Sequence, residues 1–219
     1  MKTLVDGVKK FQSEVFAAKK DLFQRLALSQ NPRALFITCS DSRIDPGLLT
    51  QTEPGELFIL RNAGNIVPSY GSQIGGTTAT IEYAIGILDV KNVIVCGHTD
   101  CAVMKGVLDP SLAKNLPSLK EWLLQAEATR QIIRDNYAHL KGDELLVRTI
   151  QENVRVQLAH LQTHPLIASR LRREAITLHG WVYSIPTGQV WAYDEDRDQF
   201  VSLSQAPLNE PVPAPKRRK

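Results

Sequence analysis

The chain has 219 residues, of which 43% are hydrophobic and 22% are charged. This composition is typical of a globular protein, and it excludes wholesale disorder and a collagen-like fold. The length allows one or two domains with a substantial core. The apolar runs are far shorter than the ~18 residues that a membrane-spanning helix requires, so we expect no membrane span.

The N-terminus and the cysteine content favour the cytoplasm. Charged residues such as Lys2, Asp6 and Lys9 follow Met1, without the apolar stretch of a signal peptide. The three cysteines are an odd number, and nothing in the sequence favours secretion. We therefore expect free or metal-bound thiols rather than disulfides.

The formal net charge of +3 lies entirely in the C-terminal segment. Ser204–Lys219 contains four basic residues and one acidic residue, so the remaining 203 residues are neutral. The same segment holds four of the twelve prolines, a composition that does not pack into a core. We interpret residues 1–203 as one folded catalytic domain and residues 204–219 as a disordered, basic tail. A neutral body requires no nucleic-acid partner, and whether the tail binds anything stays open.

Hydrophobic periodicity predicts an alternation of helices and strands. Thr3–Ser29 has apolar residues at helical spacing, and Asn31-Pro32 ends that helix. Short continuous apolar runs then predict strands that are buried on both faces, as in a parallel sheet. The predicted strands are Ala34–Thr38, Leu57–Leu60, Asn92–Cys96, Ala175–His179 and Gln189–Tyr193, and the later helices are Thr77–Leu88, one from Cys101, Ser118–Leu140 and Asp143–Thr163. We therefore expect an α/β fold, a single domain with a central, mainly parallel β-sheet flanked by helices.

Two of the buried strands end in chemically reactive side chains. The first runs into Cys39, Asp41 and Arg43, and the third runs into His98 and Cys101. Ligands bind at the carboxyl ends of parallel strands, so the two segments meet on one rim if these strands are neighbours. Cysteine and histidine are ligands that zinc prefers, and three protein ligands leave a fourth position for water. Spacing alone leaves a metal site and ordinary packing roles both open.

The remaining cysteine and histidines are expected to be structural. Cys96 lies inside the third strand, where a free cysteine packs as a small hydrophobic side chain. The other four histidines have no cysteine nearby and are expected on the surface or in the core. They are His139, His160, His164 and His179.

The reactive segments belong to longer motifs that resemble a known family. Cys39-Ser-Asp-Ser-Arg43 and Cys96-Gly-His98-x-x-Cys101 resemble the two signature motifs of the β-class carbonic anhydrases. The resemblance extends from about Leu4 to Val201 and is strongest to the cyanobacterial, carboxysome-associated branch. Further similar segments are Glu53-Pro-Gly-Glu56, Arg61-Asn-Ala-Gly-Asn65, Ile81-Glu-Tyr83, Glu127–Tyr137 and His179-Gly-Trp-Val-Tyr183.

The resemblance implies an enzyme, a carbonate dehydratase that reversibly hydrates carbon dioxide to bicarbonate with zinc-bound hydroxide. It implies Zn²⁺ as the cofactor. Two thiolate ligands make the metal a weaker acid than three histidines do, so we expect the pKa of its water to lie above ~7 and activity to rise with pH. The implied ligands are Cys39, His98 and Cys101, the implied catalytic dyad is Asp41 with Arg43, and the implied substrate-binding residues are Gln30, Phe58, Tyr83 and Ala102.

The family also implies an assembly and a location. Its sites are built across a dimer interface, so we expect a homodimer or a higher even oligomer, with the N-terminal helical arm packing on a partner subunit. The location expected from the resemblance is the cytoplasm, or the carboxysome with a scaffold protein as partner.

One departure from the family pattern keeps other functions open. The family usually follows its second zinc cysteine with two glycines, whereas Ala102-Val103 follows Cys101 here. The added methyl groups are expected to crowd the pocket. The alternatives are a zinc-binding but poorly active homologue that serves in assembly, and a zinc hydrolase of another small cumulated molecule such as carbon disulfide.

Overall fold

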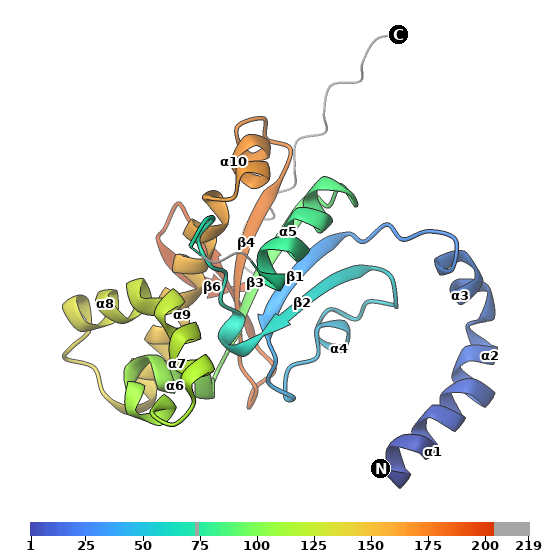
Figure 1. Ribbon diagram of the computed structural model, residues 1–219, viewed down its shortest axis with the longest axis horizontal. Helices are drawn as coiled ribbons and strands as arrows, with labels where there is room; N and C mark the ends of the chain where they lie inside the picture. The colour runs from blue at the N-terminus through green and yellow to red at the C-terminus, as the bar shows by residue number, and fades with distance from the viewer. Residues whose placement is uncertain (73–74, 204–219) are drawn as a thin grey trace.

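The computed structural model describes residues 1–72 and 75–203, and its centre is a six-stranded sheet (Figure 1). The predicted tail, residues 204–219, lies outside the described residues. The strand order is β2-β1-β3-β4-β5-β6. The strands are β1 (Ala34–Cys39), β2 (Leu57–Asn62), β3 (Asn92–His98), β4 (Thr177–Tyr183), β5 (Val190–Asp194) and β6 (Gln199–Ser202).

The sheet is mainly parallel, as the sequence predicts. β2, β1, β3 and β4 run parallel, and β5 and β6 continue the sheet in antiparallel pairing. Every residue of β1 is buried, which matches its continuous apolar run. The hydrophobic pattern does not predict β6, because this short edge strand is only half buried and lacks a clear alternation.

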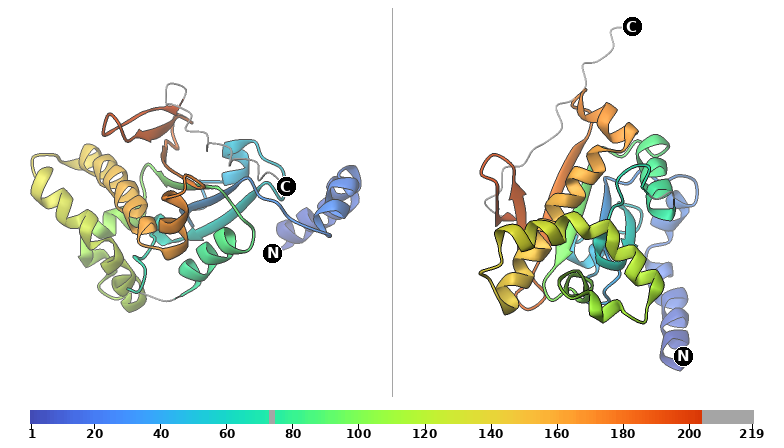
Figure 2. Two further views of the ribbon diagram at one scale, coloured as in Figure 1. Left: turned by 90° about the horizontal axis from the view of Figure 1, so that it is seen from above. Right: turned by 60° about the vertical axis from the view of Figure 1, so that its left-hand side comes forward.

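Helices cover both faces of the sheet (Figure 2, left). α5 (Gly76–Gly86), α6 (Ala102–Leu108) and α9 (Gly142–Gln162) pack on one face, where the larger core cluster lies. A smaller cluster around Phe36 and Cys96 fills the other face, beside α4 (Pro46–Thr50). α10 (Pro165–Leu171) leads into β4.

The predicted helix Ser118–Leu140 is broken in the structure. It consists of α7 (Pro117–Leu123), a 3-10 turn (Leu124–Ala126) and α8 (Glu127–Asn136). Ala126 leaves helical geometry at φ −108° and ψ 15°, which separates the two α-helices. The apolar spacing continues across this turn, so periodicity could not reveal the break.

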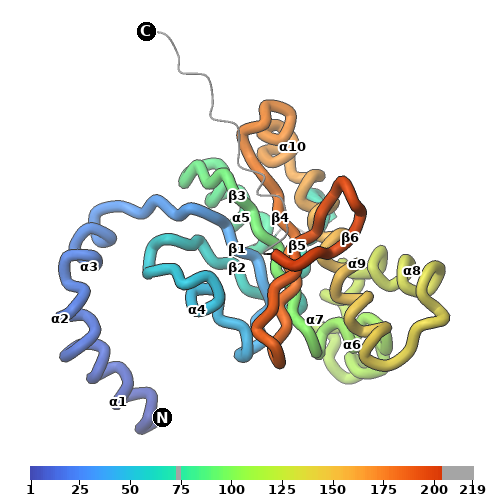
Figure 3. The backbone as a smooth tube through the Cα atoms, turned by 180° about the vertical axis from the view of Figure 1, so that it is seen from behind, coloured from blue at the N-terminus to red at the C-terminus, as the bar shows by residue number. Residues whose placement is uncertain are grey.

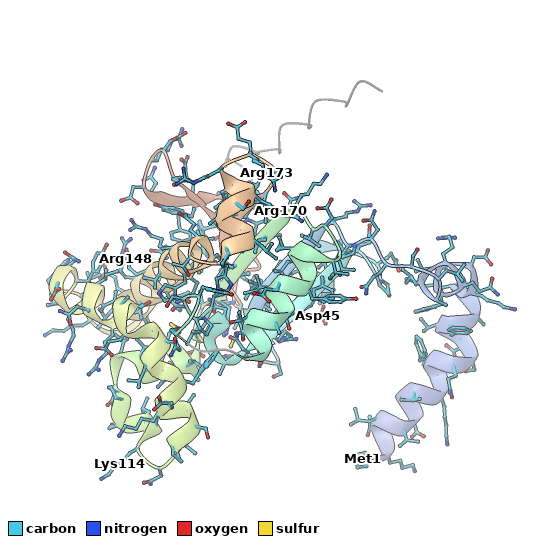
Figure 4. The ribbon with its side chains drawn as sticks, turned by 45° about the horizontal axis from the view of Figure 1, so that its top comes forward. Met1, Asp45, Lys114, Arg148, Arg170 and Arg173 are labelled. Atoms are coloured by element: carbon cyan, nitrogen blue, oxygen red, sulfur yellow. The ribbon has the colours of Figure 1, made fainter. Side chains whose placement is uncertain are left out.

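The N-terminal segment forms an arm that projects from the body (Figure 3, blue). The arm comprises α1 (Lys2–Lys10), a π-helical turn (Phe11–Val15), α2 (Phe16–Ala18) and α3 (Lys20–Leu26), so the single predicted helix is interrupted near Lys19. None of the residues in these four elements is buried. In Figure 4, the labelled Met1 marks the free end of the arm, well away from the sheet.

The arm contacts the body near its base. Lys19 Nζ lies 2.5 Å from Glu53 Oε2, and the Leu26 side chain packs beside Gly55. Across residues 1–72 and 75–203, no helix combines the length and the apolar character needed to cross a membrane.

Candidate metal centre

Three ligand-type side chains meet at the carboxyl edge of β1 and β3. Cys39 is the last residue of β1, His98 is the last residue of β3, and Cys101 caps the start of α6. β1 and β3 are neighbours in the sheet, with Thr38 paired to Cys96, so the two strand ends lie together as predicted. All three residues are buried, and the two sulfurs and a His98 ring nitrogen lie within 4.8 Å of one another.

The orientation of His98 leaves one ring nitrogen free for a metal. Its Nδ1 lies 2.9 Å from the Thr99 carbonyl oxygen, which makes Nδ1 the protonated nitrogen. Its buried Nε2 has no hydrogen-bond partner among the described residues. A buried, unpaired imidazole nitrogen is costly unless a metal or proton satisfies it, and together with two thiols it fits the Cys2His set of zinc.

The turn that carries His98 and Cys101 is fixed to β4. Thr99 N–H donates to the Tyr183 carbonyl at 2.9 Å, and Ile185 N–H donates to Thr99 Oγ1 at 3.0 Å. These bonds place the Thr99 carbonyl where it orients the His98 ring.

The surroundings of Cys39 favour its thiolate. The thiol of Cys101 and the Gly64 N–H, both directed at the Cys39 sulfur, lower the pKa of Cys39 against the opposing effect of burial. The pKa of Cys101 is raised, because its thiol donates to Cys39 and is itself buried. Without a metal the pair therefore keeps one proton, which a metal would displace.

A tight loop supplies the hydrogen bond to Cys39. Gly64 N–H lies 3.4 Å from Cys39 Sγ, and Gly64 adopts φ +82°, where a side chain would strain the backbone. Trp122 Nε1 donates to the Ala63 carbonyl at 2.8 Å, and Asn153 Nδ2 donates to the Gly64 carbonyl at 3.2 Å. The sequence reasoning missed Trp122 and Asn153, since neither carries a local motif.

The Ala102-Val103 departure is partly accommodated by this loop. A Cβ on Gly64 would lie 2.6 Å from Val103 Cγ1, so Val103 occupies the space that Gly64 leaves. Val103 is half buried against the core, and Ala102 is exposed at the start of α6.

Asp41 and Arg43 form a bidentate ion pair beside the ligands. Arg43 Nε donates to Asp41 Oδ1 at 2.9 Å, and Arg43 Nη2 donates to Asp41 Oδ2 at 2.8 Å. Asp41 Oδ2 lies 3.9 Å from His98 Nε2. These bonds hold the pKa of Asp41 well below its usual range and raise the pKa of Arg43. Asp41 is therefore a carboxylate aimed at the ligand cluster.

Of the other predicted site residues, Phe58, Tyr83 and Gln30 are not part of the ligand cluster. Phe58 on β2 stacks on Tyr83 of α5, with ring centroids 5.9 Å apart. Gln30 is exposed in the segment between the arm and β1, and among the described residues no hydrogen bond joins it to the three ligands. The fold of one chain thus brings together the ligands and the dyad, and of the predicted substrate residues only Ala102, which directly follows Cys101, lies beside them.

The structural roles predicted for Cys96 and three of the histidines agree with the structure. Cys96 is fully buried, and burial raises the pKa of its thiol. His160, His164 and His179 each lie within 3.3 Å of a backbone carbonyl or an asparagine oxygen. A separate cavity of about 950 Å³, between α9 and the start of β4, contains none of the predicted site residues.

The comparisons with known proteins agree with this centre. The family model described as carbonic anhydrase matches residues 34–190. This chain belongs to the carbonic anhydrase family. It is 49% identical to a carbonic anhydrase of Synechocystis sp. over 203 residues, covering 92% of this chain and 74% of the relative, and 46% identical to one of Pseudomonas aeruginosa over 94% of both chains.

Solved structures assign the chain to the β class. The β-carbonic anhydrase CcaA is similar with a TM-score of 0.91 and 49% identity, covering 92% of this chain and 98% of that one. A Coccomyxa β-carbonic anhydrase in complex with acetazolamide is similar with a TM-score of 0.73 and 30% identity, over 86% and 83% of the chains. The chain is therefore a β-class carbonic anhydrase, similar to cyanobacterial members, with zinc as its cofactor.

Proposed function

We propose that this carbonic anhydrase hydrates carbon dioxide at the centre formed by Cys39, His98 and Cys101, with Asp41 as the adjacent proton acceptor. The observation that carries this proposal is the buried, unpaired Nε2 of His98, which faces two sulfurs and the Asp41 carboxylate. When bound there, zinc supplies a Lewis acid that makes hydroxide available near neutral pH.

The Asp41 carboxylate is poised to accept a proton. Its ionised form is stabilised by the two bonds from Arg43, and its Oδ2 atom is directed toward the cluster. Arg43 also restrains Asp41, because a carboxylate released from this pair is close enough to the cluster to become a fourth ligand. The dyad thus keeps the fourth position accessible and accepts the proton from it.

The substrate pocket is proposed to be completed by a second subunit. Carbon dioxide is uncharged, so the stacked rings of Phe58 and Tyr83 offer suitable apolar surface, and Tyr83 is 45% exposed in the single chain. Gln30 and the backbone at Ala102 are proposed as further contacts. Gln30 lies in the segment that joins the projecting arm to β1, which supports a contribution of Gln30 to a partner's site in a homodimer or higher even oligomer.

The cellular location is proposed from the relatives. Similarity to cyanobacterial carbonic anhydrases supports the cytoplasm, or the carboxysome with a scaffold protein as partner. Fractionation of the source cell, with carboxysomes separated from the rest of the cytoplasm, tests this location.

Stopped-flow hydration assays and zinc analysis test the catalytic proposal. Cys101→Ser is expected to lose both zinc and activity, because it removes a ligand. Arg43→Ala is expected to retain zinc and lose about 100-fold or more in kcat, the range of a lost proton-transfer group. Arg170→Ala is the control, since Arg170 pairs with Asp89 on another part of the molecule (Figure 4).

The outcomes separate the alternatives. Full activity in Arg43→Ala contradicts the dyad, and full zinc content with full activity in Cys101→Ser contradicts the metal centre. If the wild-type protein binds zinc but has little hydration activity, that result supports the assembly role instead.

A further inference from the structure

Arg43 is held by two carboxylates, of which Asp41 is only one. On the side away from Asp41, Arg43 Nη1 donates to Asp100 Oδ2 at 2.9 Å, and Arg43 Nη2 donates to the Asp100 carbonyl at 3.2 Å. The guanidinium therefore uses Nε and Nη2 toward Asp41 and uses Nη1 and Nη2 toward Asp100. Four hydrogen bonds to two residues fix the plane of the guanidinium group.

Packing does not hold Arg43 in place. Its side chain is 43% exposed, and a long, exposed arginine samples several rotamers unless its donors are engaged. The bonds to Asp100 are the additional restraint that a single ion pair with Asp41 would lack.

Asp100 is itself fixed from two directions. Its second oxygen, Oδ1, accepts a hydrogen bond from Lys105 Nζ at 2.5 Å. Its backbone is in the left-handed region at φ +57°, within the turn that connects His98 to Cys101. Because Thr99 ties this turn to β4, Asp100 is a rigid support for Arg43.

We propose that Asp100 is a positioning residue for catalysis, which acts by orienting Arg43 so that Arg43 keeps Asp41 off the metal. The proposal rests on the dyad described under the proposed function. Asp100 touches neither the ligand atoms nor Asp41 through any bond found in the described residues, so its effect passes through Arg43. Without the Asp100 side chain, Arg43 loses the bond from Nη1 and keeps only the bonds to Asp41 and to the backbone carbonyl of residue 100, so the bidentate pair with Asp41 is held less firmly.

Two variants of Asp100 distinguish the role of its side chain from the effect of its backbone conformation. Asp100→Asn keeps a residue that tolerates the left-handed region and keeps a neutral acceptor for Arg43. Asp100→Gly removes the side chain, and glycine adopts this φ without strain. A loss of activity in Asp100→Gly therefore cannot be caused by backbone strain at position 100.

Asp89 provides a matched control. It also has a left-handed backbone, at φ +54°, and its exposed carboxylate also pairs with an arginine, Arg170. Asp89→Asn and Asp89→Gly repeat both substitutions in an ion pair that does not involve the dyad.

The measurements are kcat and KM for hydration, zinc content, and the visible absorption of the Co²⁺-substituted protein, which reports the ligands at the metal. Asp100→Gly is expected to lower kcat about 10- to 100-fold with KM and zinc content little changed, as expected for a misplaced catalytic group. Its cobalt spectrum is expected to shift in the same direction as that of Arg43→Ala. Asp100→Asn should be intermediate, and both Asp89 variants should stay within about twofold of the wild type.

The proposal is overturned if Asp100→Gly keeps the wild-type kcat and cobalt spectrum while Arg43→Ala is inactive. It is also overturned if Asp100→Gly loses zinc or raises KM alone, because those results assign Asp100 to metal retention or substrate binding. If Arg43→Ala itself remains fully active, the dyad fails, and that failure belongs to the proposed function.

Discussion

The charge of the Asp41 side chain depends on its neighbour Arg43. Hydrogen bonds from Arg43 hold the pKa of Asp41 below its usual value near 3.9. A carboxyl group whose pKa is lowered in the folded state stabilises the fold above its unfolded pKa, and this contribution is lost as the pH falls through the folded value. Asp41 thus remains ionised throughout the range in which the enzyme is expected to work.

The ion pair with Arg43 predicts how the stability of the metal-free Asp41→Asn variant depends on pH. We expect the free energy of unfolding at pH 7 to fall by about 1 kcal/mol, since Arg43 is partly exposed and the ion pair is screened by solvent. The difference from the wild type should shrink below about pH 4, where the unfolded Asp41 is protonated. Urea denaturation at several pH values measures this difference in unfolding free energy, and Asp6→Asn on the arm is the control. A difference that stays constant down to pH 2.5 contradicts the role of Arg43.

The metal ligands could be predicted from the sequence, but the residues that hold the site in place could not. Cys39, His98 and Cys101 could be named because their segments resemble the signature motifs of the family, whereas their side-chain types and their places after buried strands left a metal site and packing roles both open. Asp100 could not, because its partner Arg43 is 57 residues away, and an aspartate in a turn usually faces water. Trp122 resembles an ordinary core residue for the same reason, since Ala63 is 59 residues away.

The loop between β2 and Ile66 connects several elements to one ligand. The peptide group between Ala63 and Gly64 accepts from Trp122 of α7 through its carbonyl and donates to Cys39 through its N–H. Because both bonds involve the same peptide group, the indole polarises the N–H that stabilises the Cys39 thiolate.

Trp122→Phe tests this connection. We expect a loss of about 1 kcal/mol in unfolding free energy, the typical net value of one hydrogen bond, together with weaker zinc binding. Competition with a zinc chelator measures the affinity. Trp191→Phe is the control, since Trp191 packs on the same core cluster from β5. An equal loss of zinc affinity in both variants shows that only packing matters.

Element boundaries were predicted where burial and hydrophobic pattern coincide. β1 and β3 are buried on both faces, so their apolar runs identify them, whereas β6 and α4 are short and follow turns with no clear period. The antiparallel pairing of β5 with β4 follows from a short connection, Ser184–Gln189, which leaves no room for a crossover helix.

The whole molecule carries an apolar surface that the single chain leaves uncovered. On the arm the exposed large hydrophobic residues are Leu4, Val5, Val8, Phe11, Val15 and Phe16. A surface of this kind is characteristic of an interface. The family resemblance implied an N-terminal arm that packs on a partner subunit. The amphipathic pattern alone also suits a helix packed on its own body, so it could not have shown that the arm projects.

Val8→Asp is expected to shift the protein toward smaller species and to reduce hydration activity, because the proposed pocket includes Gln30 from the arm region of a partner. Light scattering after size-exclusion chromatography measures the mass of the particles. Gln12→Ala, an exposed polar change on the same arm, should leave the mass unchanged. A Val8→Asp protein of unaltered mass shows that the arm is not an interface.

The bonds that tie Thr99 to Tyr183 and Ile185 also affect the order of events during synthesis. Ile185 follows Thr99 by 86 residues, which a ribosome adds in on the order of 4–17 s. Until then the nascent chain has all three zinc ligands but lacks the strand that orients the His98 ring. Tight zinc loading is therefore expected only after β4 has left the ribosome.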